Sequence, residues 1–251
     1  MSNIEEVGGV EILENRKSLI EGLVELGVDI SEESLEKLIL FKDIMLEWNK
    51  RINLTTITEE KEIIIKHFLD SATCLCTGYI KSGMSIIDVG SGAGFPGIPV
   101  KILKSGIKMT LLDSLNKRII YLSEAVKALK LENTSAVHAR AEEAGNSKTH
   151  REHYDIVLSR AVASMNVLCE YCLPFAKVGG FFLCQKGPDI RKEIGEAEKS
   201  IKIMGGAIKE IKQYKLPQSD IKHNIIVIEK ISATPTKYPR KPGKPSASPI
   251  I

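Results

Sequence analysis

The stretch Ser85-Ile-Ile-Asp-Val-Gly-Ser-Gly-Ala-Gly-Phe-Pro-Gly97 decides how the rest of this 251-residue chain is interpreted. Its apolar start predicts a buried strand, its glycines predict a tight turn, and the apolar residues that follow predict a helix. Strand, glycine-rich turn and helix form the first half of a nucleotide-binding βαβ unit. Glycine suits such a turn because the backbone must bend sharply and a ligand must approach it closely.

The spacing of the glycines bears on which nucleotide binds. A dinucleotide loop has the pattern G-x-G-x-x-G and places a pyrophosphate on the helix N-terminus, whereas Gly90, Gly92 and Gly94 follow G-x-G-x-G. Asp88, expected at the mouth of the loop, would repel a pyrophosphate but suits the ammonium group of S-adenosylmethionine. A second acid, Asp113, ends the next predicted strand, where a carboxylate can bind a ribose. S-adenosylmethionine is the favoured cofactor, and a nicotinamide-dependent dehydrogenase is a weaker alternative.

Composition describes an ordinary globular chain, with 43% hydrophobic and 27% charged residues and a net charge of +3. It has no membrane-length apolar run and no signal-peptide pattern, so we expect a cytoplasmic protein that does not contact membranes. Five cysteines without a secretory signal indicate reduced thiols. The pairs Cys74/Cys76 and Cys169/Cys172 lie in helix-like apolar stretches, so we expect buried thiols rather than a zinc site. We expect a monomer without a metal.

The order of the predicted elements indicates an α/β fold. Residues 1–80 form a predicted N-terminal helical cap, in which Ser31 begins a helix as its N-cap. Strands and helices then alternate over residues 81–232, which implies a mainly parallel sheet covered on both faces. The last two of the seven strands predict an antiparallel hairpin, the layout of a class I S-adenosylmethionine-dependent methyltransferase with a Rossmann-like sheet. Residues 233–251 form a basic, Pro-rich tail without a core-forming pattern. The strands are predicted at residues 85–90, 108–113, 134–138, 154–159, 179–185, 207–216 and 223–230.

Several further motifs occur in order along the chain and make a family resemblance specific. They are Trp48-Asn-Lys, Asn53-Leu-Thr55, His67-Phe-Leu-Asp-Ser71, Leu112-Asp-Ser with Lys117-Arg118, Ser159-Arg-Ala161, Lys186-Gly187 and Tyr238-Pro-Arg-Lys-Pro-Gly243. With the glycine loop, they make nearly the whole chain from about Trp48 on resemble the bacterial small-subunit ribosomal RNA guanine methyltransferases. This family was historically called glucose-inhibited division protein B (RsmG). The loop alone occurs in many methyltransferases, and the combination is far more specific.

The resemblance implies methyl transfer from S-adenosylmethionine to nitrogen-7 of one guanine in 16S ribosomal RNA, either naked or in the small ribosomal subunit. It implies cofactor contacts at Gly90, Phe95, Ala141-Glu142 and Arg160. To these the loop argument adds Asp88, Gly92, Gly94 and Asp113. Arg160 is also the candidate catalytic residue, which would fix the pose of the guanine or the cofactor. His67 and Asp70 share a helical face and are expected to pack the cap onto the cofactor pocket.

Contacts to RNA are expected from basic residues and from groups that can hold a base. Asn53 and the Phe95 ring are candidates for holding or stacking a flipped guanine. Phosphate contacts provide affinity without sequence choice. The candidates for them are Lys50, Arg51, Lys117, Arg118, Arg140, Lys186, Arg240, Lys241 and Lys244. Two alternatives stay open: a class I methyltransferase with a small-molecule or protein acceptor, and a non-catalytic RNA- or ribosome-binding module.

Overall fold

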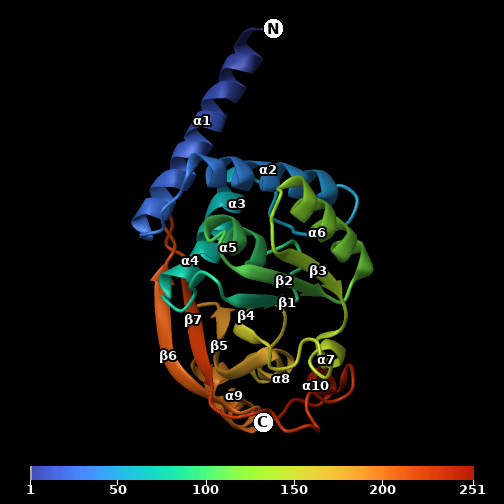
Figure 1. Cartoon of the computed structure of the whole chain (residues 1–251). Coiled ribbons are helices and arrows are strands. Elements are labelled where there is room, and N and C mark those ends of the chain that lie inside the picture. Colours follow the sequence, from blue (N-terminus) through green and yellow to red (C-terminus); the bar gives the residue numbers. More distant parts are fainter. Residues whose placement is uncertain (1) are drawn as a thin grey trace.

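A seven-stranded sheet forms the centre of the molecule, in a computed structural model that describes residues 2–251, with side chains from Leu13 onward. The strand order is β3-β2-β1-β4-β5-β7-β6 (Figure 1). All neighbouring strands run parallel except β7, which is antiparallel to both β5 and β6. The predicted sheet and its terminal hairpin are confirmed, and the fold is that of a class I S-adenosylmethionine-dependent methyltransferase. The strands are β1 (Ser85–Val89), β2 (Lys108–Asp113), β3 (Thr134–His138), β4 (Tyr154–Arg160), β5 (Ala176–Lys186), β6 (Gly206–Lys215) and β7 (Lys222–Lys230).

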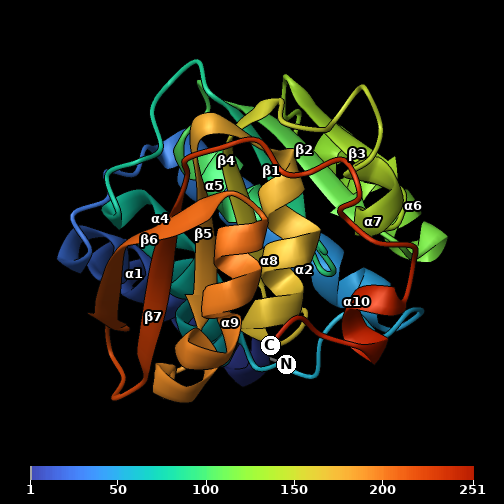
Figure 2. The same cartoon turned by 90° about the horizontal axis from the view of Figure 1, so that it is seen from below.

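Helices cover both faces of this sheet (Figures 1 and 2). Successive strand residues point to opposite faces, so Ile86 packs in one apolar cluster and Ile87 in the other. The Ile86 side is covered by α1 (Ser2–Glu25), α2 (Glu32–Asn49), α4 (Asp70–Cys76), α5 (Gly97–Leu103) and α6 (Asn116–Ala128). The Ile87 side is covered by α7 (Ala141–Ala144), α8 (Met165–Cys172), the 3-10 helix η2 (Leu173–Phe175) and α9 (Arg191–Ile203).

The two cysteine pairs lie in different halves of the core. Cys74 packs in the cluster that contains Ile86, whereas Cys169 and Cys172 pack in the cluster that contains Ile87. Burial raises the pKa of all three thiols. Among the side chains that the structure describes, from Leu13 onward, no group of His, Cys, Asp or Glu has the arrangement of a metal site. No helix within the described part of the chain is long and apolar enough to cross a membrane.

The helices before β1 pack on the helices that cover the sheet: α2 contacts α5 and α6, and α4 contacts α5 (Figure 1). The hydroxyl of Ser31 accepts a hydrogen bond from the amide of Ser34 at 3.1 Å, so Ser31 caps α2 as predicted. After α2 the chain forms α3 (Glu60–Ile63) and then a π-helical turn, η1 (Ile64–Leu69), which leads into α4. Such π-helical turns are rare and concentrate at functional sites. Here η1 carries His67 to the carboxyl edge of the sheet.

The C-terminal tail packs against the domain, although its sequence has no apolar pattern. It includes the buried residues Thr234 and Pro245 and a short helix, α10 (Lys244–Ala247). Polar contacts hold it in place: Arg151, for example, donates to the carbonyls of Thr234 and Tyr238 at 2.6 and 2.8 Å. A hydrophobic pattern could not reveal this packing, because it consists of polar bonds to the tail's backbone carbonyls and to buried acids of the domain.

Candidate active site

The glycine-rich loop follows β1 and is held close to β2. Gly90 and Ser91 donate from their amides to the carbonyl of Leu112, at 2.8 and 3.0 Å. Gly90 has φ +76°, and a Cβ atom there would lie 2.6 Å from Cγ2 of Val162. Gly90 therefore combines a left-handed backbone with a close approach of the chain, and a larger residue would meet both obstacles.

Asp88 lies beneath the loop rather than at its mouth. Its side chain is fully buried, and its Oδ2 accepts a hydrogen bond from the amide of Gly97 at 3.0 Å. Its Oδ1 is buried without a hydrogen-bond partner among the described residues. Burial raises the pKa of Asp88 to about 7, against the opposing effect of the Gly97 amide. In this position Asp88 supports the loop from below and is not among the residues that line the cavities described next.

Asp113, at the end of β2, holds the loop from the other side. Its Oδ2 accepts from the amide of Gly92 at 2.9 Å, and its Oδ1 accepts from the amide of Leu115 at 2.9 Å. The guanidinium of Arg118 lies 3.4 Å from Oδ2. Asp113 lines a cavity with Gly92 and Arg118, so this carboxylate stands where the sequence argument expected a ribose-binding acid.

Two adjoining cavities lie over the carboxyl ends of β1, β2 and β3. The larger has a volume of about 460 Å³ and the smaller of about 120 Å³, and both are lined by Gly90, Asp113, Ser114 and Val162. Ligands of open parallel sheets bind at this edge, where the strand order reverses. The larger cavity is also lined by Thr55, His67, Gly92, Phe95, Arg118 and Arg160. The smaller is also lined by Ala139, Arg140, Ala141, Glu142 and Tyr171.

Ala141 and Glu142 begin α7 directly after β3 and form one end of the smaller cavity. The Glu142 side chain is almost completely buried, and its Oε1 accepts from the amide of Gly243 at 2.8 Å. Arg140 is exposed at the rim. A fixed carboxylate therefore faces this end of the cavity.

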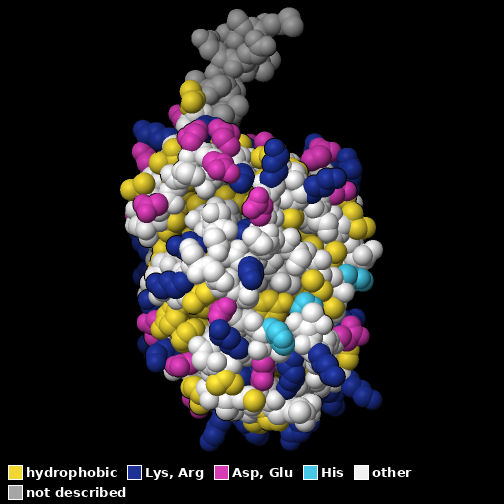
Figure 3. Space-filling model, viewed as in Figure 1, with side chains coloured by type: hydrophobic (Ala, Val, Ile, Leu, Met, Phe, Trp, Pro, Cys, Tyr) yellow, Lys and Arg dark blue, Asp and Glu magenta, His cyan; other side chains and the backbone are white. Residues whose placement is uncertain are grey.

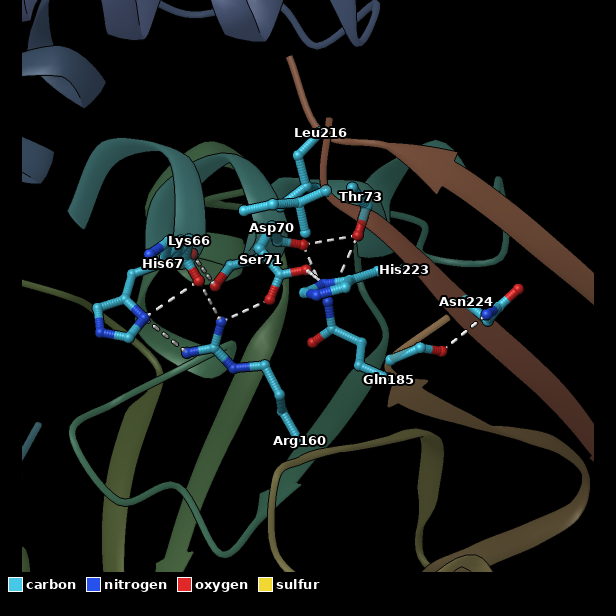
Figure 4. Close-up of polar contacts among 12 residues, drawn as sticks. Lys66, His67, Asp70, Ser71, Thr73, Arg160, Gln185, Leu216, His223 and Asn224 are labelled. Atoms are coloured by element: carbon cyan, nitrogen blue, oxygen red, sulfur yellow. Dashed lines mark hydrogen bonds and ion pairs between the residues drawn. The ribbon is translucent and has the colours of Figure 1, made fainter. Parts of the chain in front are cut away.

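Arg160, the last residue of β4, joins the cap to the sheet (Figure 4). Its Nη1 donates to Oδ2 of Asp70 at 2.6 Å and to the carbonyl of Lys66 at 3.0 Å. Its Nη2 lies 3.2 Å from Nδ1 of His67. The guanidinium carbon also stands 5.2 Å from the centre of the Phe95 ring, within the range of a cation–π contact. Arg160 thus connects the glycine loop, β4 and the cap.

His67 lines the larger cavity next to Arg160. Its ring stacks on Phe95, and its Nε2 lies 3.0 Å from the hydroxyl oxygen of Thr55. Burial and the neighbouring charge of Arg160 lower the pKa of His67 to about 4. The ring is therefore neutral at physiological pH, and His67 positions its neighbours without adding a charge.

A third cavity, of about 410 Å³, lies over the carboxyl ends of β4 and β5 and shares His67, Arg160 and Ala161 with the larger one. Its walls include Asp70, Gln185, Lys186 and His223. The third cavity therefore adjoins the larger cavity at Arg160.

Asp70 carries the negative charge in the wall of this third cavity. Its Oδ1 is 2.6 Å from Nδ1 of His223, and its other oxygen is bound by Arg160. Burial opposes ionisation of Asp70, but the bond from His223 and the charge of Arg160 outweigh it and keep its pKa below the usual value. The Gln185 amide donates to the carbonyl of Asp70 at 2.9 Å.

Sequence reasoning missed Gln185 and His223. Gln185 follows a buried apolar run at the carboxyl end of β5, and β7 runs antiparallel to β5, with Lys186 opposite Asn224. The first residues of β7 therefore reach the same edge as the last residues of β5. The predicted hairpin could have indicated His223, but only if its second strand had been paired with β5.

The proposed RNA contacts occupy different situations. Lys117, Lys241 and Arg140 are exposed, as is Asn53, whereas Arg118 faces the larger cavity. Lys186 is bound to the carbonyl of Ala163 and to Glu193, both at 2.7 Å. Arg240 is bound by the buried Glu170. In the view of Figure 3, Lys and Arg side chains are prominent at the lower end of the molecule, where α9, α10 and the tail lie.

The Phe95 ring has little free surface for stacking on a base. Only 4% of the residue is exposed, and His67, Arg160, Phe41 and Phe68 surround its ring.

Asn49, rather than the exposed Asn53, orders the loop that follows α2. The Asn49 side chain accepts hydrogen bonds from the amides of Leu54 and Thr55 and donates one to the carbonyl of Thr55.

Comparison with known proteins places the chain in a family. The family model described as rRNA small subunit methyltransferase G matches residues 34–222. The chain is 54% identical to the Ribosomal RNA small subunit methyltransferase G of Alkaliphilus metalliredigens, over 95% of this chain and 100% of the relative. It is 51% identical to the protein of the same name from Acetivibrio thermocellus, over 95% and 98%.

Solved structures agree with the fold. The [4+2]-cyclase SpnF is similar with a TM-score of 0.50 at 12% identity, over 64% of this chain and 80% of SpnF. The YcgJ protein of Bacillus subtilis also has a TM-score of 0.50 at 12% identity, over 65% and 99%. At such identity the likeness concerns the fold alone. The family match and the high identity to full-length relatives go further, and on their evidence this chain belongs to the rRNA small subunit methyltransferase G (GidB) family.

Proposed function

We propose that this methyltransferase uses S-adenosylmethionine to methylate nitrogen-7 of a guanine in the 16S ribosomal RNA of the small subunit. The observation that carries the proposal is the continuous run of cavities along the carboxyl edge of the sheet, divided at Arg160. One side has the elements of a nucleoside site, and the other has room for an acceptor. The names of the relatives supply the class of RNA.

The residues present fit S-adenosylmethionine. Gly90 leaves a cradle that a Cβ atom would fill, and Asp113 presents a carboxylate at the end of β2, where a ribose can bind. Ala141 and Glu142 would hold the adenine in the smaller cavity. Arg160, next to the loop, is suited to the cofactor's carboxylate. The bound cofactor supplies an electrophilic sulfonium methyl group.

Asp88 would act on the cofactor through the loop. Its carboxyl group holds the Gly97 amide from below, so its contribution is the shape of the turn that Gly90, Gly92 and Gly94 form. Asp88 would therefore support cofactor binding by holding the backbone of the loop, and not by contacting the ammonium group directly.

The acceptor would enter the third cavity, beside Arg160. Nitrogen-7 of guanine has an in-plane lone pair, so methylation there requires no prior proton removal and no general base. The work of the protein is then alignment, which can contribute about 7–11 kcal/mol in favourable systems. The methylated purine is a cation, and the ionised Asp70 in the cavity wall is placed to stabilise the positive charge as it develops. The exposed Lys117 and Lys241 would contact RNA phosphates.

A methyl-transfer assay with competing acceptors tests the proposal. The purified protein is incubated with methyl-labelled S-adenosylmethionine and, in parallel, with small-subunit ribosomal RNA, small subunits, total protein and a metabolite extract. Label in the RNA or subunit samples, recovered as 7-methylguanosine after digestion, is the expected result. Label in protein or metabolites instead would assign another acceptor, and cofactor binding without any transfer would favour a binding module.

A further inference from the structure

The C-terminal tail runs along the smaller cavity and contacts its wall. We call residues 234–247 the strap: they follow β7, pass beneath α7 and end in α10, which lies close to α7 and α8 (Figures 1 and 2). Gly243 of the strap is 101 residues away in sequence from Glu142, which it contacts.

An ion pair anchors the strap to α8. The Arg240 guanidinium bonds the Glu170 carboxylate from Nε at 2.9 Å and from Nη2 at 2.6 Å, and the Arg240 amide adds a third bond at 2.8 Å. Only 1% of Glu170 is exposed. The next residue along α8, Tyr171, lines the smaller cavity. The anchor thus holds the strap beside a wall of that cavity.

On either side of the anchor, the strap contacts α7 or the residues directly after it. The amide of Gly243 donates to Oε1 of Glu142 at 2.8 Å. The side-chain amide of Asn146 bridges the carbonyls of Glu142 and Pro239, both at 3.0 Å. Gly243 has φ +81°, which turns the chain into α10 and directs its N–H towards the carboxylate. Glu142 is fixed by the strap as well as by its own helix.

We infer that the strap is part of the cofactor site and orients Glu142 to accept a hydrogen bond from the exocyclic amine of an adenine in the smaller cavity. The inference rests on the proposed function, because it takes the ligand to be an adenosine derivative. A carboxylate on a helix of one turn has several rotamers, and a ligand that must select one loses affinity. The Gly243 amide fixes the Glu142 rotamer before the ligand binds. It occupies Oε1, so Oε2 remains as the acceptor for the adenine amine.

Calorimetry on the full chain, with S-adenosylhomocysteine and with its inosine analogue, tests this role. The inosine analogue lacks the exocyclic amine. Arg240→Ala removes the anchor. Gly243→Pro removes the N–H donor and, because proline cannot adopt φ +81°, also the turn into α10, three residues after Arg240. Lys237→Ala, an exposed position on the same strap, is the matched control. Thermal unfolding of each protein shows that it is folded, and Gly243→Pro decides the question if Arg240→Ala is unstable.

We expect wild type and Lys237→Ala to bind S-adenosylhomocysteine equally and to prefer it to the inosine analogue. The two strap variants should bind it about ten-fold more weakly, the effect of one hydrogen bond to a charged group, and should lose the preference for adenine. A general structural effect would weaken both ligands alike and leave the preference intact, which would overturn the inference. Unchanged affinities would also overturn it. Failure of the wild type to bind either ligand would instead overturn the proposed function itself.

Discussion

The ring of His67 stacks on the ring of Phe95, with centroids 4.4 Å apart and planes inclined by 22°. His67 comes from a π-helical turn of the cap, and Phe95 follows the glycines of the cofactor loop. The cap and the loop meet here, next to Arg160, so η1 forms part of the wall of the candidate active site. The same contact explains why Phe95 is suited to supporting the pocket rather than to stacking on a base.

Gly90→Ala should abolish cofactor binding. The new methyl group would lie 2.6 Å from Val162 and the residue would keep φ +76°, so the loop must move away from the cavity. Gly179→Ala is the control, because Gly179 has φ +84° and no atom near its Cβ position. Both variants should lose about 1–2 kcal/mol of stability from the left-handed backbone. Equal cofactor affinity in the two variants, measured by calorimetry, would contradict the placement of the pocket.

Asp113→Asn should weaken cofactor binding by about ten-fold or more, because a charged acceptor for the ribose and for the Gly92 amide becomes neutral. Asp155→Asn provides a comparison at the opposite edge of the sheet, where Asp155 accepts from the amide of Ser85 at 2.8 Å. That variant should bind the cofactor like the wild type. Calorimetric titration with S-adenosylhomocysteine distinguishes the two, and a matching loss in both would indicate a general effect on the sheet.

Asp88 should make the stability of the protein pH-dependent. Burial raises its pKa from 3.8 to about 7, so the folded state favours the protonated form. This contribution to stability is complete below about pH 4 and is lost as the pH rises through about 7, by a few kcal/mol in order of magnitude. Asp88→Asn keeps the shape and cannot ionise. In denaturant titrations between about pH 4 and 8, the free energy of unfolding of Asp88→Asn should rise relative to that of the wild type. A difference that does not change with pH would refute the raised pKa of Asp88.

Asp70→Asn should lower the rate of methyl transfer more than it lowers cofactor affinity. The variant loses the negative charge that faces the third cavity, and we expect a fall in kcat of about ten- to a hundred-fold from the lost charge stabilisation. It also leaves the Arg160 charge partly uncompensated, so some loss of stability should accompany it. Single-turnover rates at saturating cofactor provide the test. A normal rate in a folded variant would remove Asp70 from the mechanism.

Lys117→Ala should reduce RNA affinity and its salt dependence. Lys117 is exposed at the start of α6, beside the cavity-lining Arg118. Losing one phosphate contact should reduce the slope of log affinity against log salt by about 1. Lys81→Ala removes an exposed lysine that precedes β1, at the amino edge of the sheet, and should leave the slope unchanged. Filter binding of small-subunit ribosomal RNA across a salt series would show the difference, and equal slopes would exclude Lys117 from the interface.

The sequence predicted the sheet well because its strands are apolar runs separated by turn residues. The same pattern placed the second acid, Asp113, at the carboxyl end of β2, since a βαβ unit brings the carboxyl ends of its parallel strands to one edge of the sheet. The predicted position of Asp88 at the mouth of the loop was wrong. It lies between Ile87 and Val89 in a strand that is buried on both faces, so the same apolar run that predicted β1 also indicated a buried carboxyl group.

The missing parts of the prediction are pairings between distant residues. His223 meets Asp70 across 153 positions, and Arg240 meets Glu170 across 70. The sequence showed a basic tail, and a basic tail is more often a solvated surface than the partner of a buried acid. Only the packing of α8 beside the tail identifies Glu170 as that partner.

Mass spectrometry of 16S ribosomal RNA from cells with and without this gene shows most directly whether a ribosomal guanine is the acceptor. We expect one 7-methylguanosine to be absent without the gene and to return with the wild-type gene but not with the Gly90→Ala variant. An identical set of modified nucleosides in both cells would contradict the claim that ribosomal guanine is the acceptor.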